Sequence, residues 1–188
     1  MEQCGLLVIG GSAGSLDVLI KVLPDLDHTL PFPIVIVLHR KSGKESMLID
    51  LLSNKTKLEV KELEEKEKMK GATIYIAPPN YHLLIENNKT FSLDASEKIN
   101  FSRPSIDVTF ESAAPVFGEN LVCLLLSGAN SDGTNGLQKV KENGGKVLIQ
   151  NPSSAIVPFM PQYALEQVAI DAVLNPNEMA QYINHLSR

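Results

Sequence analysis

The amino-acid sequence predicts an α/β fold: a single doubly wound, mainly parallel, Rossmann-like sheet with helices on both faces. Short continuous aliphatic runs recur along the chain, as is typical of strands that are buried on both sides. Apolar residues at helical spacing follow several of these runs, and alternating strands and helices favour a parallel sheet. The strand runs occupy residues 6–9, 34–38, 73–77, 121–126 and 146–150.

The first strand, turn and helix are the clearest part of this pattern. The run LLVI at residues 6–9 ends in GGSAGS, whose glycines permit a tight turn. Apolar residues then recur at the spacing of an amphipathic helix, at Leu16, Leu19, Ile20 and Leu23. We therefore expect a strand, a turn with Ser12 at its apex, and a helix.

The middle of the chain continues the alternation and adds one antiparallel feature. A helix near residues 45–52 and a half-exposed strand within 57–63 follow the second aliphatic run. An Asn-Asn pair separates two β-prone runs, 81–85 and 90–93. This arrangement predicts a hairpin that forms an antiparallel edge of the sheet.

Helix signals and one more strand run fill the C-terminal half. Ser105 is placed to cap a helix that reaches about Phe117, although Pro115 should end or bend it. Further elements are expected near residues 133–142 and 161–168 (helices), at 171–174 (a strand), and in a last helix begun by Asn175, Pro176 and Glu178. Because no repeat or linker interrupts the pattern, residues 1–188 are expected to form one domain.

Composition and charge narrow the classes of function. The net charge of −5, with no long basic stripe, argues against a nucleic-acid partner. No apolar run approaches the roughly 18 residues of a membrane span and no leader precedes the first strand, so we expect no membrane insertion and a cytoplasmic location. Cys4 and Cys123 lack CxxC spacing and are expected to be free thiols. The histidines show no ligand spacing, so no metal is expected.

Three polar residues belong to the carboxyl edge of the predicted sheet. Ser12, His39 and Asp132 each follow the end of a different aliphatic strand run. Open parallel sheets place their sites in the crevice beyond the carboxyl ends of the strands. A serine, a histidine and an aspartate at that edge are the components of a hydrolytic triad, in whatever order they occur along the chain.

Each of these residues also has a structural explanation. Ser12 suits a turn, His39 suits a polar strand end, and Asp132 suits the N-cap of the helix that follows it. For GGSAGS, phosphate binding at a helix N-terminus and simple close packing stand beside nucleophilic catalysis. The occurrence of all three chemical types at one edge favours catalysis over three separate explanations.

Motifs spread along the chain carry a family resemblance: VIGGSAGS, VLHRK, IYIAPPNYH, SRPSIDV and LLLSGANSDGTNG. In type and order they resemble the catalytic domain of the chemotaxis protein-glutamate methylesterase (CheB) family, nearly end to end. The resemblance implies a doubly wound, mainly parallel sheet with an antiparallel edge. It also implies a catalytic triad of Ser12, His39 and Asp132.

The resemblance further implies an activity: hydrolysis of glutamate γ-methyl esters on chemoreceptor-like proteins, with release of methanol. Ser12 attacks the ester, His39 takes its proton, and Asp132 holds the histidine tautomer. The backbone N–H groups of Ala13 and Ala129 are the candidate oxyanion donors. The family also deamidates glutamine by the same acyl chemistry, and neither a metal nor an organic cofactor is implied.

Two further residues are candidate substrate contacts. His82 in APPNYH and Arg103 in SRPS belong to matching motifs, and the alternative for each is to cap a loop or to pair with a surface acid. Ala13 and Ser15 stand where the family commonly has Thr and Gly, and Arg40 stands where it commonly has Met. These departures concern substrate choice more than the chemistry.

Regulation and an alternative function complete the expectations. Typical family members carry an N-terminal receiver domain, and this chain begins too close to its first strand to hold one. We therefore expect either a separate receiver-domain regulator or a chain that is a cut-out or a specialised paralogue. The alternative is a non-catalytic or nucleotide-binding regulatory module. Against nucleotide binding, GGSAGS lacks both the GxGxxG and the GxxxxGK[ST] pattern.

Overall fold

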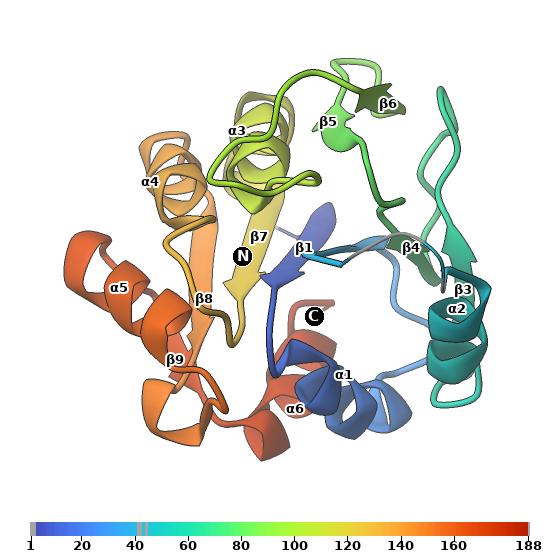
Figure 1. Ribbon diagram of the computed structural model, residues 1–188. Coiled ribbons are helices and arrows are strands. Elements are labelled where there is room, and N and C mark those ends of the chain that lie inside the picture. The colour runs from blue at the N-terminus through green and yellow to red at the C-terminus, as the bar shows by residue number, and fades with distance from the viewer. Residues whose placement is uncertain (1–2, 41–42, 44, 188) are drawn as a thin grey trace.

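The computed structural model describes residues 3–40, 43 and 45–187 of the chain. Within these ranges seven strands form one sheet in the order β3-β4-β2-β1-β7-β8-β9, and all neighbouring strands are parallel (Figure 1). The expected doubly wound parallel sheet is thereby confirmed. Its strands are β1 (Leu6–Gly11), β2 (Ile34–Leu38), β3 (Glu59–Glu62), β4 (Thr73–Ile76), β7 (Leu121–Leu125), β8 (Lys146–Gln150) and β9 (Ala172–Leu174).

Helices cover both faces of this sheet, as Figure 1 shows. One face carries α1 (Ser15–Val22), α2 (Glu45–Ser53) and α6 (Pro176–His185), and the other carries α3 (Ile106–Phe117), α4 (Thr134–Glu142) and α5 (Phe159–Gln167). Short 3-10 turns are η1 (Leu23–Asp25), η2 (Gly118–Asn120) and η3 (Pro152–Ser154). The long predicted helices are confirmed, and so is the Asn175–Glu178 capping box of α6.

Two apolar cores lie between the sheet and its helix layers. Leu7 and Ile9 of β1 face the layer of α1 and α6, whereas Leu6 and Val8 face the layer of α3 and α4. Successive side chains of a strand point to opposite faces. The strand runs are therefore aliphatic at every position because both faces are buried.

The predicted hairpin is present, but it does not form an edge of the large sheet. β5 (His82–Ile85) and β6 (Phe91–Asp94) pair antiparallel in a separate two-stranded sheet. Side chains of α3 bind this hairpin: Thr109 Oγ1 donates to Leu83 O at 2.9 Å, and Ser112 Oγ accepts from Ile85 N at 2.9 Å. Because helix side chains satisfy these backbone groups, the hairpin packs on α3.

One helix boundary differs from the sequence pattern. The sequence predicts a helix that begins at Pro161, but α5 begins at Phe159 and places Pro161 in its first turn, where a missing N–H costs nothing. Pro115 lies inside α3, which does not end at the proline and reaches Phe117 as predicted. Within the described ranges, no helix is both long and apolar enough to cross a lipid bilayer.

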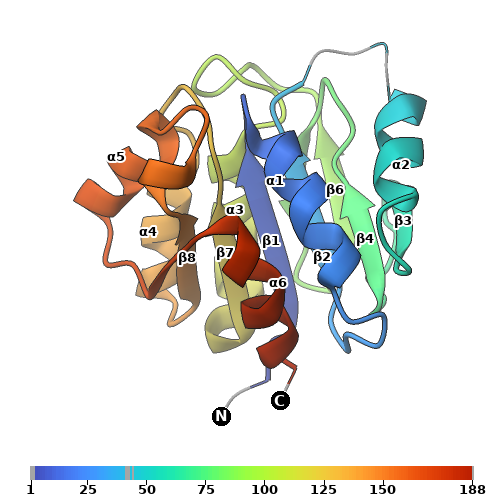
Figure 2. The same cartoon turned by 90° about the horizontal axis from the view of Figure 1, so that it is seen from below.

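β1 lies between β2 and β7 at the centre of the sheet. The connections that follow β1 and β7 therefore run to opposite sides of the sheet, and such a reversal of strand order leaves a crevice at the carboxyl ends of these strands. Figure 2 shows the N- and C-terminal ends of the chain at the opposite end of the strands. Gly10 allows the start of α3 to rest directly on β1, because a Cβ there would lie 2.5 Å from Ile106 Cγ2.

Candidate active site

The structure places Ser12, His39 and Asp132 at one edge of the sheet, after β1, β2 and β7 respectively. Backbone hydrogen bonds connect the loops at this edge. Ser12 N donates to Ser127 O at 2.9 Å, and His39 N donates to Gly11 O at 3.1 Å. The predicted convergence of the three residues on one edge is therefore observed.

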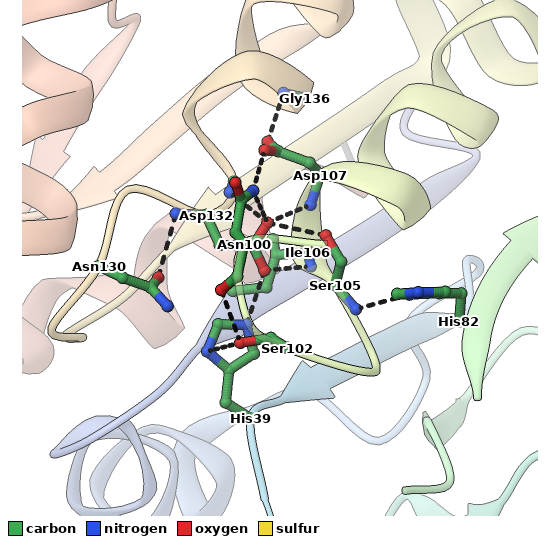
Figure 3. Close-up of polar contacts among 11 residues, drawn as sticks. His39, His82, Asn100, Ser102, Ser105, Ile106, Asp107, Asn130, Asp132 and Gly136 are labelled. Atoms are coloured by element: carbon green, nitrogen blue, oxygen red, sulfur yellow. Dashed lines mark hydrogen bonds and ion pairs between the residues drawn. The ribbon is translucent and has the colours of Figure 1, made fainter. Parts of the chain in front are cut away.

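His39 and Asp132 are in direct contact (Figure 3). Nε2 of His39 lies 2.6 Å from Oδ2 of Asp132, and the Asp132 side chain is fully buried while 11% of the His39 side chain is exposed. An ionised carboxylate only accepts hydrogen bonds, so the His39 proton lies on Nε2. Nδ1 is then the nitrogen that is free to accept a proton.

Asp132 is held by an unusually complete set of donors. In the described structure its Oδ2 accepts from His39 Nε2 and Ile106 N, and its Oδ1 accepts from Asn100 Nδ2, Ser105 Oγ, Asp107 N and Gly133 N, at 2.6–3.1 Å. Burial raises the pKa of Asp132, but the hydrogen bonds from His39, Ile106 and Asp107 outweigh it and hold the pKa below its ordinary 3.8. The carboxylate therefore stays ionised at neutral pH despite its burial.

The contacts of Asp132 also show whether it is the N-cap of the helix that follows it. The residue that caps α4 is Gly133, and Asp132 instead binds the first N–H groups of α3, a different helix. Ser105 is the N-cap residue of α3 as predicted, but its hydroxyl donates to Asp132 at 2.8 Å and does not cap its own helix. The N-terminus of α3 thus stabilises the negative charge beside His39.

Ser12 and His39 share an edge without a direct hydrogen bond. Among the described residues, Ser12 Oγ has no hydrogen-bond partner, and the hydroxyl that faces His39 Nδ1 is that of Ser102, at 3.4 Å. The side chain of Ser12 is partly exposed. The structure therefore assembles the histidine–aspartate pair and leaves the Ser12 hydroxyl free.

The loops beside Ser12 present unoccupied backbone donors. Ala13 and Ala129 are exposed, and within the described part of the chain neither N–H donates to another protein group. By contrast, the N–H of Gly128 is occupied by Val157 O at 3.0 Å. Gly128 packs against Ser12, since a Cβ at this glycine would lie 3.0 Å from Ser12 Cβ. The two loops thus lie against each other beside the serine.

The structure corrects the expectation for His82 and shows a loop contact for Arg103. His82 is fully buried: its Nε2 donates to Glu97 O at 2.7 Å and its Nδ1 accepts from Ser105 N at 3.2 Å. It supports the loop before α3 and is not accessible to a substrate. Arg103 Nη1 donates to the carbonyls of Ala95 and Ser96, which is a loop-capping contact, and its contact with substrate stays a prediction.

Sequence reasoning missed the turn that covers the site. Ile99 and Ser102 pair across a tight turn in which Asn100 and Phe101 have φ values of 50° and 62°. Asn100 binds Asp132, Ser102 faces His39, and Phe101 is 97% exposed at the tip. The available signal was the tolerance of asparagine for left-handed backbone, which marks turns in general.

The structure supports the expectations for thiols. Cys4 and Cys123 are free and buried, and burial raises the pKa of the Cys4 thiol to about 12. These thiols are therefore protonated and serve as small apolar side chains. Within the described ranges, no group of three or more His, Cys, Asp or Glu residues has the arrangement of a metal site.

Comparison with known proteins agrees with the fold. The CheB methylesterase family model matches residues 7–183. A Leptospira interrogans protein named "Putative protein-glutamate methylesterase/protein-glutamine glutaminase" is 45% identical over 97% of this chain and 94% of its own length. A Thermotoga maritima protein named "Protein-glutamate methylesterase/protein-glutamine glutaminase" is 37% identical, and the match covers 90% of this chain but 50% of that protein.

A solved structure extends this agreement to three dimensions. The crystal structure of the Thermotoga maritima CheB methylesterase catalytic domain matches with a TM-score of 0.93 and 34% sequence identity, over 98% of this chain and 100% of that one. The family match, the close relatives and the shared fold lead to one conclusion. This chain belongs to the CheB methylesterase family.

Proposed function

We propose that this protein is a serine hydrolase that removes methyl groups from glutamate γ-methyl esters of chemoreceptor-like proteins and releases methanol. Membership of the CheB methylesterase family supports the hydrolase over a nucleotide-binding module. The observation that carries the proposal is the 2.6 Å hydrogen bond between His39 Nε2 and the buried, ionised Asp132. It prepares Nδ1 of His39 to accept a proton at the edge where Ser12 lies.

In the proposed reaction, Ser12 Oγ attacks the ester carbonyl while His39 Nδ1 takes the hydroxyl proton. Asp132 stabilises the imidazolium that forms. The free N–H groups of Ala13 and Ala129 are suited to bind the oxyanion of the tetrahedral intermediate. His39 returns its proton to the methoxy oxygen, methanol leaves, and water then hydrolyses the acyl-serine to free glutamate.

The same sequence of steps accommodates an amide substrate. If the bond cleaved is a glutamine side-chain amide, ammonia leaves in place of methanol and the product is again glutamate. The names of the Leptospira and Thermotoga relatives include a protein-glutamine glutaminase. We therefore include glutamine deamidation in the proposed function.

The test is methanol release from methyl-esterified receptor helices by wild type, Ser12→Ala and Ser102→Ala. Ser12→Ala should lower turnover by about three or more orders of magnitude with the fold intact. Ser102→Ala is the matched control, since the Ser102 hydroxyl is the one that faces His39 Nδ1, at 3.4 Å, and it lies outside the GGSAGS turn. We expect it to retain at least a tenth of wild-type turnover. The reverse ranking would assign the nucleophile to Ser102.

The proposal extends to partners and location. The protein substrate would meet the exposed Phe101 beside the site, together with Lys98, which lines a shallow hollow there. Free, buried cysteines suit a reducing compartment, and we propose the cytoplasm. A separate receiver-domain regulator stays a prediction. It is tested by adding a phosphorylated receiver domain and measuring any change in methanol release.

A further inference from the structure

A second buried carboxylate lies beside Asp132 and has no role in the reaction described above. Asp107, in the first turn of α3, is 4% exposed. The side-chain NH2 of Asn100 donates to Asp107 Oδ2 at 2.9 Å and to Asp132 Oδ1 at 3.1 Å. Figure 3 shows this amide between the two carboxylates. One amide group therefore bridges the triad carboxylate and its neighbour.

The bridge can be assembled in one orientation only. Asp107 Oδ1 is fixed from the other side by the N–H of Gly136 in α4, at 2.7 Å. With both carboxylates acting as acceptors, the NH2 of Asn100 must point toward them, because a reversed amide would place its oxygen between two negative groups. Asp107 thus determines how Asn100 is presented to Asp132.

We propose that Asp107 and Asn100 are positioning residues for this hydrolytic site: Asp107 orients Asn100, and Asn100 holds Asp132 Oδ1 so that Oδ2 stays directed at His39. The inference rests on the proposed function of the Ser12, His39 and Asp132 edge. Neither positioning residue contacts the ester. A carboxylate free to rotate would misalign His39, and small misplacements of a catalytic group cost large factors in rate.

The charge state of Asp107 gives the arrangement a pH dependence. Burial raises the pKa of Asp107 to about 6, and the nearby Asp132 charge adds to this while the Gly136 N–H opposes it. Protonation weakens Asp107 as an acceptor for Asn100. The positioning of Asp132 is therefore expected to loosen as pH falls through about 6.

Other ionisable groups surround this pair and define the control. Glu111 lies one turn further along α3 and is attracted to Lys139 of α4, and the buried His82 of β5 reaches the same loop through Ser105. Glu111 is exposed and makes no hydrogen bond to Asn100. Glu111→Gln therefore removes one negative charge from the same helix and leaves the bridge intact.

The experiment measures kcat and KM for methanol release by wild type, Asp107→Asn, Asn100→Gly and Glu111→Gln. Asp107→Asn sets one NH2 group against another and should lower kcat about ten- to a hundredfold with KM nearly unchanged. Asn100→Gly removes the bridge, suits the φ of 50°, and should match it. Glu111→Gln should stay within about threefold of wild type.

The pH profile separates positioning from mere structural support. The ratio of wild-type to Asp107→Asn kcat should fall toward one as pH drops from 8 to 5, because acid protonates Asp107 only in the wild type. A ratio independent of pH, or an Asp107→Asn rate equal to that of Glu111→Gln, would overturn the proposal. If Asp107→Asn does not fold, Asn100→Gly decides by its kcat.

A second readout distinguishes a failure of the positioning role from a failure of the proposed substrate. The rate at which a fluorophosphonate labels Ser12 depends on His39 and Asp132 but needs no receptor. If wild type releases no methanol yet is labelled, with labelling slowed in both bridge variants and not in Glu111→Gln, the substrate is wrong and the positioning role holds. Wild type that neither releases methanol nor is labelled would overturn both.

Discussion

Replacing Asp132 with asparagine tests whether its charge and fixed orientation make His39 a base. The new NH2 avoids the Oδ1 position, where four donors converge, and takes the Oδ2 position facing Ile106 N and His39 Nε2. His39 must then accept at Nε2 and carry its proton on Nδ1. That tautomer cannot take a proton from Ser12.

Two magnitudes follow from this geometry. The wrong tautomer should lower kcat by about four orders of magnitude, the typical cost in a serine triad. The N–H of Ile106, which donates to Oδ2 at 2.7 Å, would lose its acceptor in a buried position. A buried unsatisfied donor costs about 1–3 kcal/mol, so the free energy of unfolding at pH 7 should fall by that amount.

The assay compares methanol release and thermal unfolding of wild type, Asp132→Asn and Asp50→Asn. Asp50 is exposed on α2, so its variant removes the same charge without touching the site. Nitrogen NMR of the His39 ring reports the tautomer directly. An Asp132→Asn protein with kcat within tenfold of wild type and an unchanged melting temperature would refute the reasoning.

Three further predictions concern packing, capping and pH. Gly10→Ala drives a methyl group to 2.5 Å from Ile106 Cγ2 and should cost about 1–3 kcal/mol in urea unfolding, with little loss if α3 can shift freely. Glu178→Ala removes the acceptor of Asn175 N and should destabilise the protein by about 1 kcal/mol, measurable as a lower melting temperature. An unchanged melting temperature would show that the capping box does not stabilise α6. The raised pKa of Asp107 means that the folded state binds the Asp107 proton more tightly than the unfolded chain does. The free energy of unfolding should therefore decline by up to about 3 kcal/mol as pH rises from about 4 to 6. This decline should vanish in Asp107→Asn.

Much of the fold was predictable because it depends on local pattern. The aliphatic runs identified β1, β2, β4, β7 and β8, since burial on both faces leaves no polar position in such strands. The place of the hairpin was not predictable. It depends on hydrogen bonds from Thr109 and Ser112 of α3, which lie more than twenty positions away in the sequence.

The candidate site, like the fold, was predictable only in part. Parallel strand order alone predicted that Ser12, His39 and Asp132 share an edge. Motif position suggested that His82 contacts substrate, but the residue is fully buried beneath the loop before α3. Burial of a single polar residue depends on how elements pack, and the sequence around His82 carries no signal for it.

By itself, the sequence determined the order of strands and helices, the aliphatic core and the chemical types that gather at the crevice, because backbone geometry and hydrophobic periodicity act over neighbouring residues. Only the tertiary structure decided which donors hold Asp132, which nitrogen of His39 is free, and that Asn100 bridges two carboxylates. The physical reason is that these hydrogen bonds join residues far apart in the chain. They form only once α3 rests on β1 and presents its N-terminus to the carboxyl edge of the sheet.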